Sequence, residues 1–254
     1  IPAFAGMTVE NNMLLTIDIG NTSITFGVFQ GKRLKSTWKI ATQSVFSKEM
    51  IRLPKDIDAA IISSVVPKAT PVVKKMVAKK YNIRPLVLGE NIKAPIKNLY
   101  RNPRQVGQDR LVDAVAVKEL YSCPAIVIDF GTAITFDIIS KKGDYLGGII
   151  VPGIETSVRA LSRQAALLPI IKVSAPKELV GRDTVSSMKS GIFNGFGVLC
   201  DGLVAKLKTK YGPMRVIATG GHARLMSKFS RSIPKVDPNL TLQGLRLIYK
   251  KSLK

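Results

Sequence analysis

The chain has 254 residues, enough for one large domain or for two modest domains with cores of their own. Hydrophobic residues make up 46% and charged residues 22%, a composition that excludes a disordered or low-complexity chain. No apolar run reaches the roughly 18 to 20 residues that span a bilayer, which excludes a protein built of membrane-spanning helices. Two cysteines, Cys123 and Cys200, are too few for a disulfide framework or a zinc site, so we expect reduced core thiols in a cytoplasmic protein.

The formal net charge of +22 is the unusual feature of the composition. A field of this sign attracts nucleic acid, anionic membrane surfaces or small anions such as ATP. The basic residues are spread along the chain in short pairs such as Lys74-Lys75, and no aromatic residues alternate with them as a single-strand binding platform requires. We therefore interpret the charge as a solvated, lysine-rich surface and keep nucleic-acid binding as the alternative.

The fold is expected to begin at Met13, which directly precedes the first predicted strand. The sequence starts with Ile1, and residues 1–12 have no basic region ahead of their apolar residues, so they do not resemble a secretory signal. We interpret residues 1–12 as an extension without structure.

A duplicated pattern comes next. Residues 15–28 read LTIDIGNTSITFGV, and residues 126–138 read IVIDFGTAITFDI. Each copy places an apolar strand before Asp-x-Gly and continues into Ile-Thr-Phe, so that Asp18 corresponds to Asp129. Two such copies predict two similar halves, each opening with a β-hairpin.

The rest of the chain supports this division. Strands alternate with helices in each half, which predicts an α/β architecture with mixed sheets flanked by helices. We place the boundary just before the second copy of the pattern. The predicted halves are therefore residues 13–120 and residues 121–254.

The residue types in the two hairpins suit a phosphate ligand. A strand that ends in Asp delivers a carboxylate to the end of a sheet, and the following Gly lets the chain turn tightly and expose backbone N–H groups. Asn21-Thr22 and Thr132 add short polar donors. Such turns hold phosphate oxygens, while the carboxylate holds a cation that phosphates also need. One Asp-x-Gly is usually only a turn, but two equivalent copies indicate a nucleotide site.

Two features are expected in the second half. Residues 185–211 are typical of one long helix or two broken ones, and their four glycines require a packing reason such as the close approach of another helix. Residues 216–221 read VIATGG, a strand that enters either a glycine-rich ligand turn or an ordinary strand-to-helix loop. His222 follows this turn, and we expect it at most to line the site, since no partner Ser or Cys is evident.

Taken together, these segments resemble the type III pantothenate kinases, a family within the superfamily of acetate and sugar kinases, heat-shock ATPases and actin. The matching segments are DIGNT at 18–22, YRNPRQVGQDRLVDAVA at 100–116, IDFGTAITFD at 128–137, YLGGIIVPGI at 145–154, VGRDT at 180–184 and TGGHA at 219–223. GQDR is the specific motif, because Asp-Gly turns are shared by the whole superfamily. The resemblance implies duplicated ribonuclease H-like, or actin-like, halves that close on ATP.

The resemblance also implies roles for individual residues. ATP phosphates and Mg²⁺ would be met by the first turn, which comprises Asp18, Ile19, Gly20, Asn21, Thr22, Ser23, Ile24 and Thr25. Thr132 would touch ATP, and Asp129 matches the ligand of a monovalent cation, K⁺ or NH₄⁺. The pantothenate-binding positions are Tyr100, Gly107, Gln108, Asp109, Arg110 and Thr184. The product would be 4'-phosphopantothenate, in the first step of coenzyme A biosynthesis, and the family forms homodimers.

Three of these residues have simpler alternative roles. Asp109 matches the proposed general base of the family. A carboxylate can accept the proton of the attacking hydroxyl. Asp109 could also be the N-cap of the helix that follows. Arg110 offers a charged fork for a carboxylate or phosphate, or else forms a surface ion pair with Asp113. Thr184 either reaches the substrate or caps its helix.

Two other functions compete with a pantothenate kinase. The first is a non-catalytic family member that acts as a transcription accessory factor, which the charge of +22 favours. The intact carboxylates of Asp18, Asp109 and Asp129 argue against it. The second is a kinase for another small hydroxyl compound, against which the GQDR motif weighs.

Overall fold

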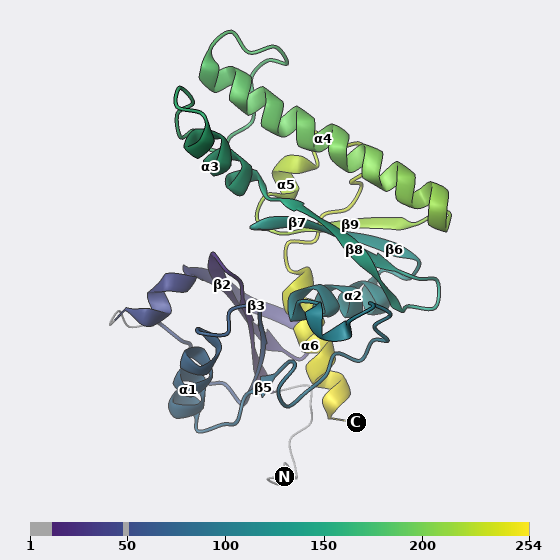
Figure 1. Ribbon diagram of the computed structural model, residues 1–254. Coiled ribbons are helices and arrows are strands. Elements are labelled where there is room, and N and C mark those ends of the chain that lie inside the picture. Colours follow the sequence, from purple (N-terminus) through teal and green to yellow (C-terminus); the bar gives the residue numbers. More distant parts are fainter. Residues whose placement is uncertain (1–11, 48–50, 254) are drawn as a thin grey trace. The chain divides into compact units, whose positions relative to one another are not determined.

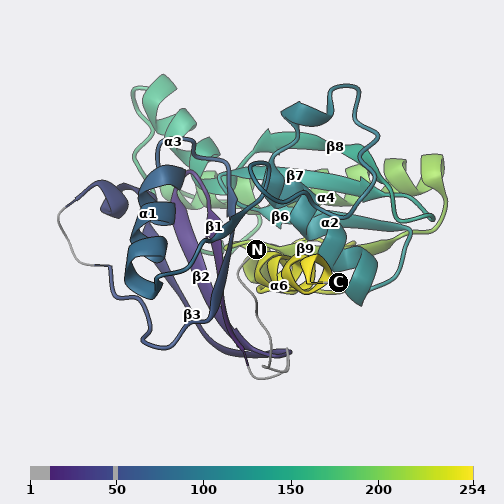
Figure 2. The same cartoon turned by 90° about the horizontal axis from the view of Figure 1, so that it is seen from below.

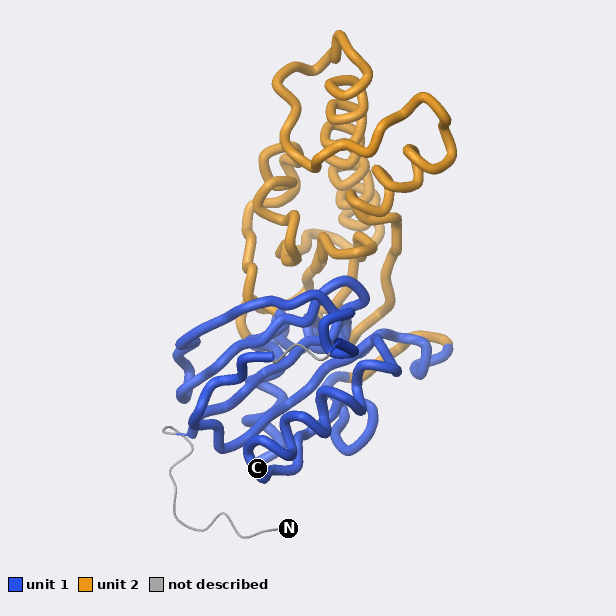
Figure 3. The backbone as a smooth tube through the Cα atoms, turned by 90° about the vertical axis from the view of Figure 1, so that its left-hand side faces the viewer, with its two compact units in different colours: residues 1–96, 102–119, 241–254 blue, residues 97–101, 120–240 orange. Residues whose placement is uncertain are grey.

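The computed structural model describes residues 12–47 and 51–253, which form two compact units (Figures 1 and 3). Of the described residues, unit 1 contains 12–47, 51–96, 102–119 and 241–253, and unit 2 contains 97–101 and 120–240. The predicted unstructured extension, apart from Asn12, lies outside the described residues. No helix in the described part of the chain is long and apolar enough to cross a membrane.

The units differ from the predicted halves in two segments and at the boundary residue Leu120, which belongs to unit 2. Residues 97–101 belong to unit 2, and the C-terminal segment 241–253 belongs to unit 1. Helix α6 (Leu240–Ser252) explains the second difference, because its Leu242 and Leu245 are buried in the same cluster as Leu14 and Phe29 of unit 1. Burial of these side chains against the first sheet outweighs proximity along the chain.

Unit 1 is built on a five-stranded sheet of order β3-β2-β1-β4-β5, in which β1 pairs antiparallel with β2 and parallel with β4. Helices lie on opposite faces of this sheet, with α1 on one face and α6 on the other (Figure 2). The strands are β1 (Met13–Ile19), β2 (Ser23–Gln30), β3 (Arg33–Ala41), β4 (Ala59–Ser64) and β5 (Leu86–Val87). The helices are the 3-10 turns η1 (Thr42–Phe46) and η2 (Pro103–Gln105), with α1 (Thr70–Tyr81), α2 (Gln108–Leu120) and α6.

The central strand β1 is largely buried on both faces because helices cover both. Alternate residues, Leu15, Ile17 and Ile19, are buried in the same cluster as Val73 and Val77 of α1. Leu14, on the other face, is buried in the cluster that contains Val112 of α2 and Leu242 of α6. The strand period of two therefore places Asp18 on the face that carries α2 and α6.

Unit 2 has a four-stranded sheet of order β8-β7-β6-β9, with β6 antiparallel to β7 and parallel to β9. Its helices lie over one face of the sheet, with α5 between α4 and the strands (Figure 1). The elements are β6 (Ala125–Phe130), β7 (Ala133–Ile139), β8 (Tyr145–Pro152), α3 (Ile154–Gln164), α4 (Thr184–Tyr211), β9 (Arg215–Thr219) and α5 (Ala223–Met226).

The two sheets repeat one plan, and this confirms the predicted α/β fold of duplicated halves. In each, the second strand of the hairpin pairs with a third antiparallel strand, and the first strand of the hairpin pairs with a parallel strand. The register is also equivalent, since Asp18 lies opposite Thr25 and Asp129 lies opposite Thr135. Each unit opens with the predicted hairpin.

Helix α4 is a single helix of 28 residues, so of the two predicted alternatives the single long helix is right and the two broken helices are wrong. A packing reason exists for Gly197, where an added methyl group would overlap the carbonyl of Phe229. The other three glycines, Gly191, Gly195 and Gly202, have nothing within 4 Å of such a methyl group among the described residues. The prediction of close packing is thus right for one glycine within the chain.

The two cysteines differ in burial. Cys200, in α4, is fully buried, and burial raises the pKa of its thiol to about 12. Cys123 is only half-buried, so the expectation of two core thiols is wrong for this residue.

Candidate active site

The hairpin turn of unit 1 is held in place by hydrogen bonds within the turn and from Thr42. Gly20 N–H donates to the carbonyl of Ser23 at 3.0 Å, which closes the turn. Thr42, in η1, donates through Oγ1 to the carbonyl of Gly20 at 2.6 Å and through its N–H to the carbonyl of Thr22 at 3.0 Å. Asn21 and Thr22 stay exposed at the tip. The turn is therefore held in shape while its tip faces outward.

Asp18 lies at the end of β1, between two hydroxyl-bearing neighbours. It is paired in register with Thr25 of β2 and with Ser63 of β4. Asp18 is half-buried, whereas Ser63 is completely buried. The carboxylate thus stands at the carboxyl ends of two parallel strands, the edge where open α/β sheets bind ligands.

The GQDR motif forms the start of α2 at this same edge of the sheet. Val65, just after β4, donates its N–H to the carbonyl of Ile19 at 3.0 Å. A methyl group on Gly107 would lie 3.4 Å from Val65 Cγ1 and 2.5 Å from Oδ1 of Asp109. A side chain at position 107 would therefore force the Asp109 carboxylate to shift. The structure therefore brings Asp18 and Asp109 to one edge of unit 1.

Asp109 is the second residue of α2, not its N-cap, and its Oδ1 accepts from the N–H of Arg110 at 2.8 Å. A carboxylate in the first turn is stabilised by the positive end of the helix dipole. Gln108, the first residue of α2, lies with its side chain near the α-carbon of Gly89. Both groups belong to unit 1.

Arg110 and Asp113 are both buried, so the alternative of a surface ion pair is wrong. Their exposed fractions are 9% and 2%. Buried charged groups need charged or hydrogen-bonding partners, which makes this pair part of the interior beneath the start of α2. A surface helix position would not show this burial.

Tyr100 belongs to unit 2, although the motif that follows it belongs to unit 1. Its segment adds to β8, because Leu99 N–H donates to the carbonyl of Tyr145 and Tyr145 N–H donates to that of Lys97, both at 2.9 Å. The Tyr145 hydroxyl in turn donates to Oδ1 of the buried Asp137 at 2.8 Å. This network fixes the backbone that carries Tyr100.

In unit 2 the second hairpin places Asp129 against the Thr-Gly-Gly turn. Gly131 N–H donates to the carbonyl of Ala133 at 3.1 Å and closes the hairpin. Gly220 has a φ of +92°, and a methyl group on it would overlap Oδ1 of Asp129. The sequence indicated a glycine turn here, but it did not show that this turn receives the Asp129 carboxylate.

Helix α3 begins against the tip of the second hairpin. The carbonyl of Thr132 accepts from Gly153 N–H at 3.1 Å and from Thr156 Oγ1 at 2.7 Å, while Thr132 itself is exposed. Sequence reasoning missed Thr156. The only sequence indication was its position just after the matched YLGGIIVPGI segment.

Two further predicted residues lie in unit 2. His222 Nε2 is 3.8 Å from Oε1 of Glu155, which lies in the first turn of α3, and its role in lining the site stays a prediction. Thr184 is the first residue of α4 and is exposed. Asp183 caps this helix, with Oδ1 accepting from Ser186 N–H at 2.9 Å, so the alternative that Thr184 is the cap is wrong.

The described residues contain no cluster of side chains that could bind a metal ion. No group of three or more His, Cys, Asp or Glu side chains is arranged there to hold a metal ion. Mg²⁺ commonly binds through one or two carboxylates together with water and substrate phosphates.

The two units each contain a mixed sheet flanked by helices, and each sheet contains an Asp-x-Gly hairpin. This is the actin-like ATPase fold, and the following two are among the solved structures that share it. A protein described as a conserved Baf family transcriptional activator from Campylobacter jejuni matches with a TM-score of 0.61 and 21% identity, over 94% of this chain and 98% of that chain. The activator of the 2-hydroxyisocaproyl-CoA dehydratase from Clostridium difficile, with bound ADPNP, matches with a TM-score of 0.51 and 12% identity, over 95% and 97%. At these identities the likeness shows the fold alone.

The chain belongs to the type III pantothenate kinase family. The family model described as type III pantothenate kinase matches residues 14–206. The type III pantothenate kinase of Syntrophus aciditrophicus is 44% identical over 94% of this chain and 100% of its own length. The predicted resemblance is confirmed, and so is the enzyme class. The protein is an ATP- and Mg²⁺-dependent kinase of coenzyme A biosynthesis that acts on pantothenate.

Proposed function

We propose that Asp109 is the general base that accepts the proton of the primary hydroxyl of pantothenate while the γ-phosphoryl group of ATP is transferred to that hydroxyl. The observation that carries this assignment is the position of the Asp109 carboxylate. It lies over the α-carbon of Gly107, at the sheet edge where β1 delivers Asp18. Phosphoryl transfer requires mainly alignment and charge neutralisation, and a carboxylate beside the acceptor removes the leaving proton.

The first hairpin is proposed to hold the ATP phosphates. Gly20 and the exposed tip residues Asn21 and Thr22 offer backbone and side-chain donors, and the bonds from Thr42 keep the turn in one shape. The Asp18 carboxylate suits the magnesium ion that accompanies ATP, since Mg²⁺ prefers oxygen ligands. When bound, the ion neutralises charge on the β- and γ-phosphates.

Asp129 is proposed to bind a monovalent cation, K⁺ or NH₄⁺, with Thr132 touching ATP. The contact between the Asp129 carboxylate and the turn at Gly220 supports this, because the turn holds the carboxylate in one position. Loop carbonyls near such a carboxylate can replace the hydration shell of K⁺. The cation would add positive charge beside the hairpin turn of unit 2.

The remaining predicted residues would bind pantothenate. Arg110 has a planar, permanently charged fork that suits the pantothenate carboxylate. The hydrogen-bonded backbone next to Tyr100 supports a role for this residue in binding pantothenate. Gly107, Gln108 and Thr184 complete the proposed set.

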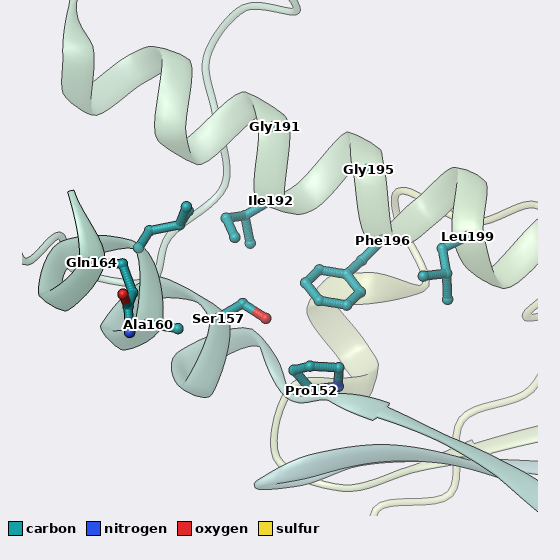
Figure 4. A pocket seen from close by; sticks show the side chains of 10 residues that line it. Pro152, Ser157, Ala160, Gln164, Gly191, Ile192, Gly195, Phe196 and Leu199 are labelled. Atoms are coloured by element: carbon teal, nitrogen blue, oxygen red, sulfur yellow. The ribbon is translucent and has the colours of Figure 1, made fainter. Parts of the chain in front are cut away.

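A homodimer is proposed as the working form. An apolar groove in unit 2 runs between α3 and α4 (Figure 4). Gly191 and Gly195 leave its α4 side open for close approach, and Val198, one helical turn on, is 73% exposed. The groove is lined by Pro152, Ser157, Ala160, Leu161, Gln164, Gly191, Ile192, Gly195, Phe196 and Leu199. A monomeric mass by light scattering at micromolar concentration would count against the dimer.

A coupled ADP-release assay tests the proposed function. The assay contains pantothenate, ATP and magnesium and is run once with potassium and once with sodium. Pantothenate-dependent turnover that requires potassium would support the substrate and the role of Asp129 together. Absence of turnover in both salts, from protein shown to be folded, would contradict the proposal and make salt-dependent DNA binding the next measurement.

A further inference from the structure

Two adjacent serines at the end of β4 differ in their hydrogen bonding. Oγ of Ser64 accepts from the N–H of Val66 at 3.1 Å and from Oγ1 of Thr70 at 2.7 Å, so this hydroxyl ties the strand to the start of α1. Ser63 is completely buried, and its Oγ has no hydrogen-bond partner among the described residues. Ser64 therefore has a structural role. No hydrogen bond among the described residues accounts for the hydroxyl of Ser63.

A buried hydroxyl without a partner lowers the stability of a fold, because the group has lost its hydrogen bonds to water. Alanine would fill nearly the same space without this penalty. The exposed fraction of Ser63 is 0%, which leaves its hydroxyl no contact with solvent. We therefore expect the hydrogen-bond partner of Ser63 to be a protein group that reaches its hydroxyl in another state of the molecule.

The position of Ser63 identifies the carboxylate it can reach. Ser63 lies opposite Asp18 in the parallel pairing of β4 with β1. Ile61, two residues before it, is buried in one cluster with Leu14, four residues before Asp18. Since strand residues alternate between faces, Ser63 and Asp18 point to the same face of the sheet. Neighbouring strands are about 4.7–4.9 Å apart, so the two side chains are within reach of one another.

Asp18 and Ser63 differ in burial. The Asp18 side chain is half-buried at the sheet edge, where its carboxylate can turn about its side-chain bonds. Ser63 is enclosed in the face covered by α2 and α6. A rotation of Asp18 would thus bring the acceptor to a fixed donor.

Unit 2 repeats the strand positions and the burial of this pair. There the parallel neighbour β9 places Thr219 opposite Asp129, and Thr219 is 2% exposed. Both units therefore carry a buried hydroxyl residue beside the carboxylate that ends the hairpin strand. A shared position in two sheets of the same plan argues against an accidental serine at 63.

We propose that Ser63 is a positioning residue for Asp18. When Mg²⁺ with ATP binds, the Asp18 carboxylate turns so that one oxygen faces the ion and the other accepts a hydrogen bond from the Ser63 hydroxyl. The bond gives the buried hydroxyl its partner only in the liganded state, so its free energy favours binding of the magnesium complex over the free nucleotide. This inference rests on the proposed role of Asp18.

The test compares Ser63→Ala with Ser64→Ala in the full chain. Binding of the non-hydrolysable nucleotide ADPNP is measured by calorimetry with and without Mg²⁺, and thermal unfolding is measured without ligand. Ser63→Ala is expected to keep or raise the unfolding temperature and to weaken binding with Mg²⁺ by about tenfold, the effect of losing one hydrogen bond to a charged group. Binding without Mg²⁺ should not change.

Ser64→Ala is the matched control. It removes the hydrogen bonds that Ser64 Oγ accepts from Val66 N–H and from Thr70 of α1, so it should lower the unfolding temperature and leave the magnesium dependence of binding as in the wild type. If Ser63→Ala does not fold, Ser63→Cys keeps the size with a weaker donor, and it should show a smaller loss in the same measurement.

The outcomes separate two failures. If the wild type shows no magnesium-dependent nucleotide binding, the proposed role of Asp18 is wrong, and the inference about Ser63 is overturned with it. If the wild type binds as expected and the folded Ser63 variant matches it with and without Mg²⁺, only the inference about Ser63 is overturned.

Discussion

The two hairpins of this protein share a framework and differ in what stands beside their carboxylates. In both, an apolar strand ends in Asp, a glycine turn follows, and a hydroxyl residue lies opposite on the parallel neighbour. Beside Asp18 the chain places the start of a helix that carries Asp109. Beside Asp129 it places the glycine turn at Gly220.

This comparison shows how a duplicated fold acquires two different chemical roles. The sheet determines where the carboxylate stands, because strand pairing fixes its register. The segments that connect the strands determine what the carboxylate meets. In unit 1 the segment after β5 carries Asp109 on α2, whereas in unit 2 the segment after β9 carries Gly220. Unit 2 also has a long connection from β8 to β9, residues 153–214, which includes α3 and α4. We expect changes in unit 1 to affect chemistry and those in unit 2 to affect cation dependence or stability.

The largest effect is expected from Asp109→Asn in unit 1. If Asp109 is the general base, this change should lower turnover by roughly 10²–10⁴-fold, because the amide cannot accept the proton. Nucleotide affinity and the circular dichroism spectrum should stay as in the wild type. Near-normal turnover of the folded variant would remove Asp109 from this role.

The next effect tests unit 2 through Gly220→Ala. The added methyl group would overlap Oδ1 of Asp129, and alanine is strained at a φ of +92°. We expect the potassium concentration for half-maximal activity to rise by roughly 10- to 100-fold, as when a group that orients a metal ligand is lost. Gly221→Ala is the control, since no atom of the described residues, other than its chain neighbours, lies within 4 Å of its added methyl group. Equal behaviour of the two variants would contradict the assignment of Asp129.

A smaller effect, on stability alone, concerns α4, which lies in the long connection of unit 2. Gly197→Ala should lower the free energy of unfolding by about 1–3 kcal/mol, because its methyl group would overlap the carbonyl of Phe229. Gly202→Ala should raise it by up to about 1 kcal/mol, because alanine favours the helix and meets open space. Urea titrations measure both. Destabilisation by both variants would show that open positions on α4 are covered in solution.

The smallest effect should appear only at high pH, in unit 2. Burial, with the hydrogen bond to Asp237 and its negative charge, raises the pKa of Tyr121 to about 12. The raised pKa contributes stability that is present below the unfolded value of about 10 and is lost as pH rises toward the folded value. Tyr121→Phe should be less stable than the wild type by about 1 kcal/mol or less near pH 8, and this difference should shrink by pH 11. A difference independent of pH would contradict the pairing.

The sequence by itself determined the local features of this protein. The two hairpins follow from apolar strands that end in Asp-x-Gly, and α4 follows from a long stretch without proline. The family followed from GQDR and the neighbouring motifs. These features depend on residues close together in the chain, so spacing and residue type were sufficient to predict them.

Only the tertiary structure decided which distant segments meet. It placed α6 in unit 1 and the Tyr100 segment in unit 2, seated Asp129 against Gly220, and buried Ser63 beside Asp18. It also showed that Asp183 rather than Thr184 caps α4, which depends on a backbone turn that either residue could have made. The physical reason is that burial and strand register arise from contacts between segments far apart in the chain, which periodicity within one segment does not encode.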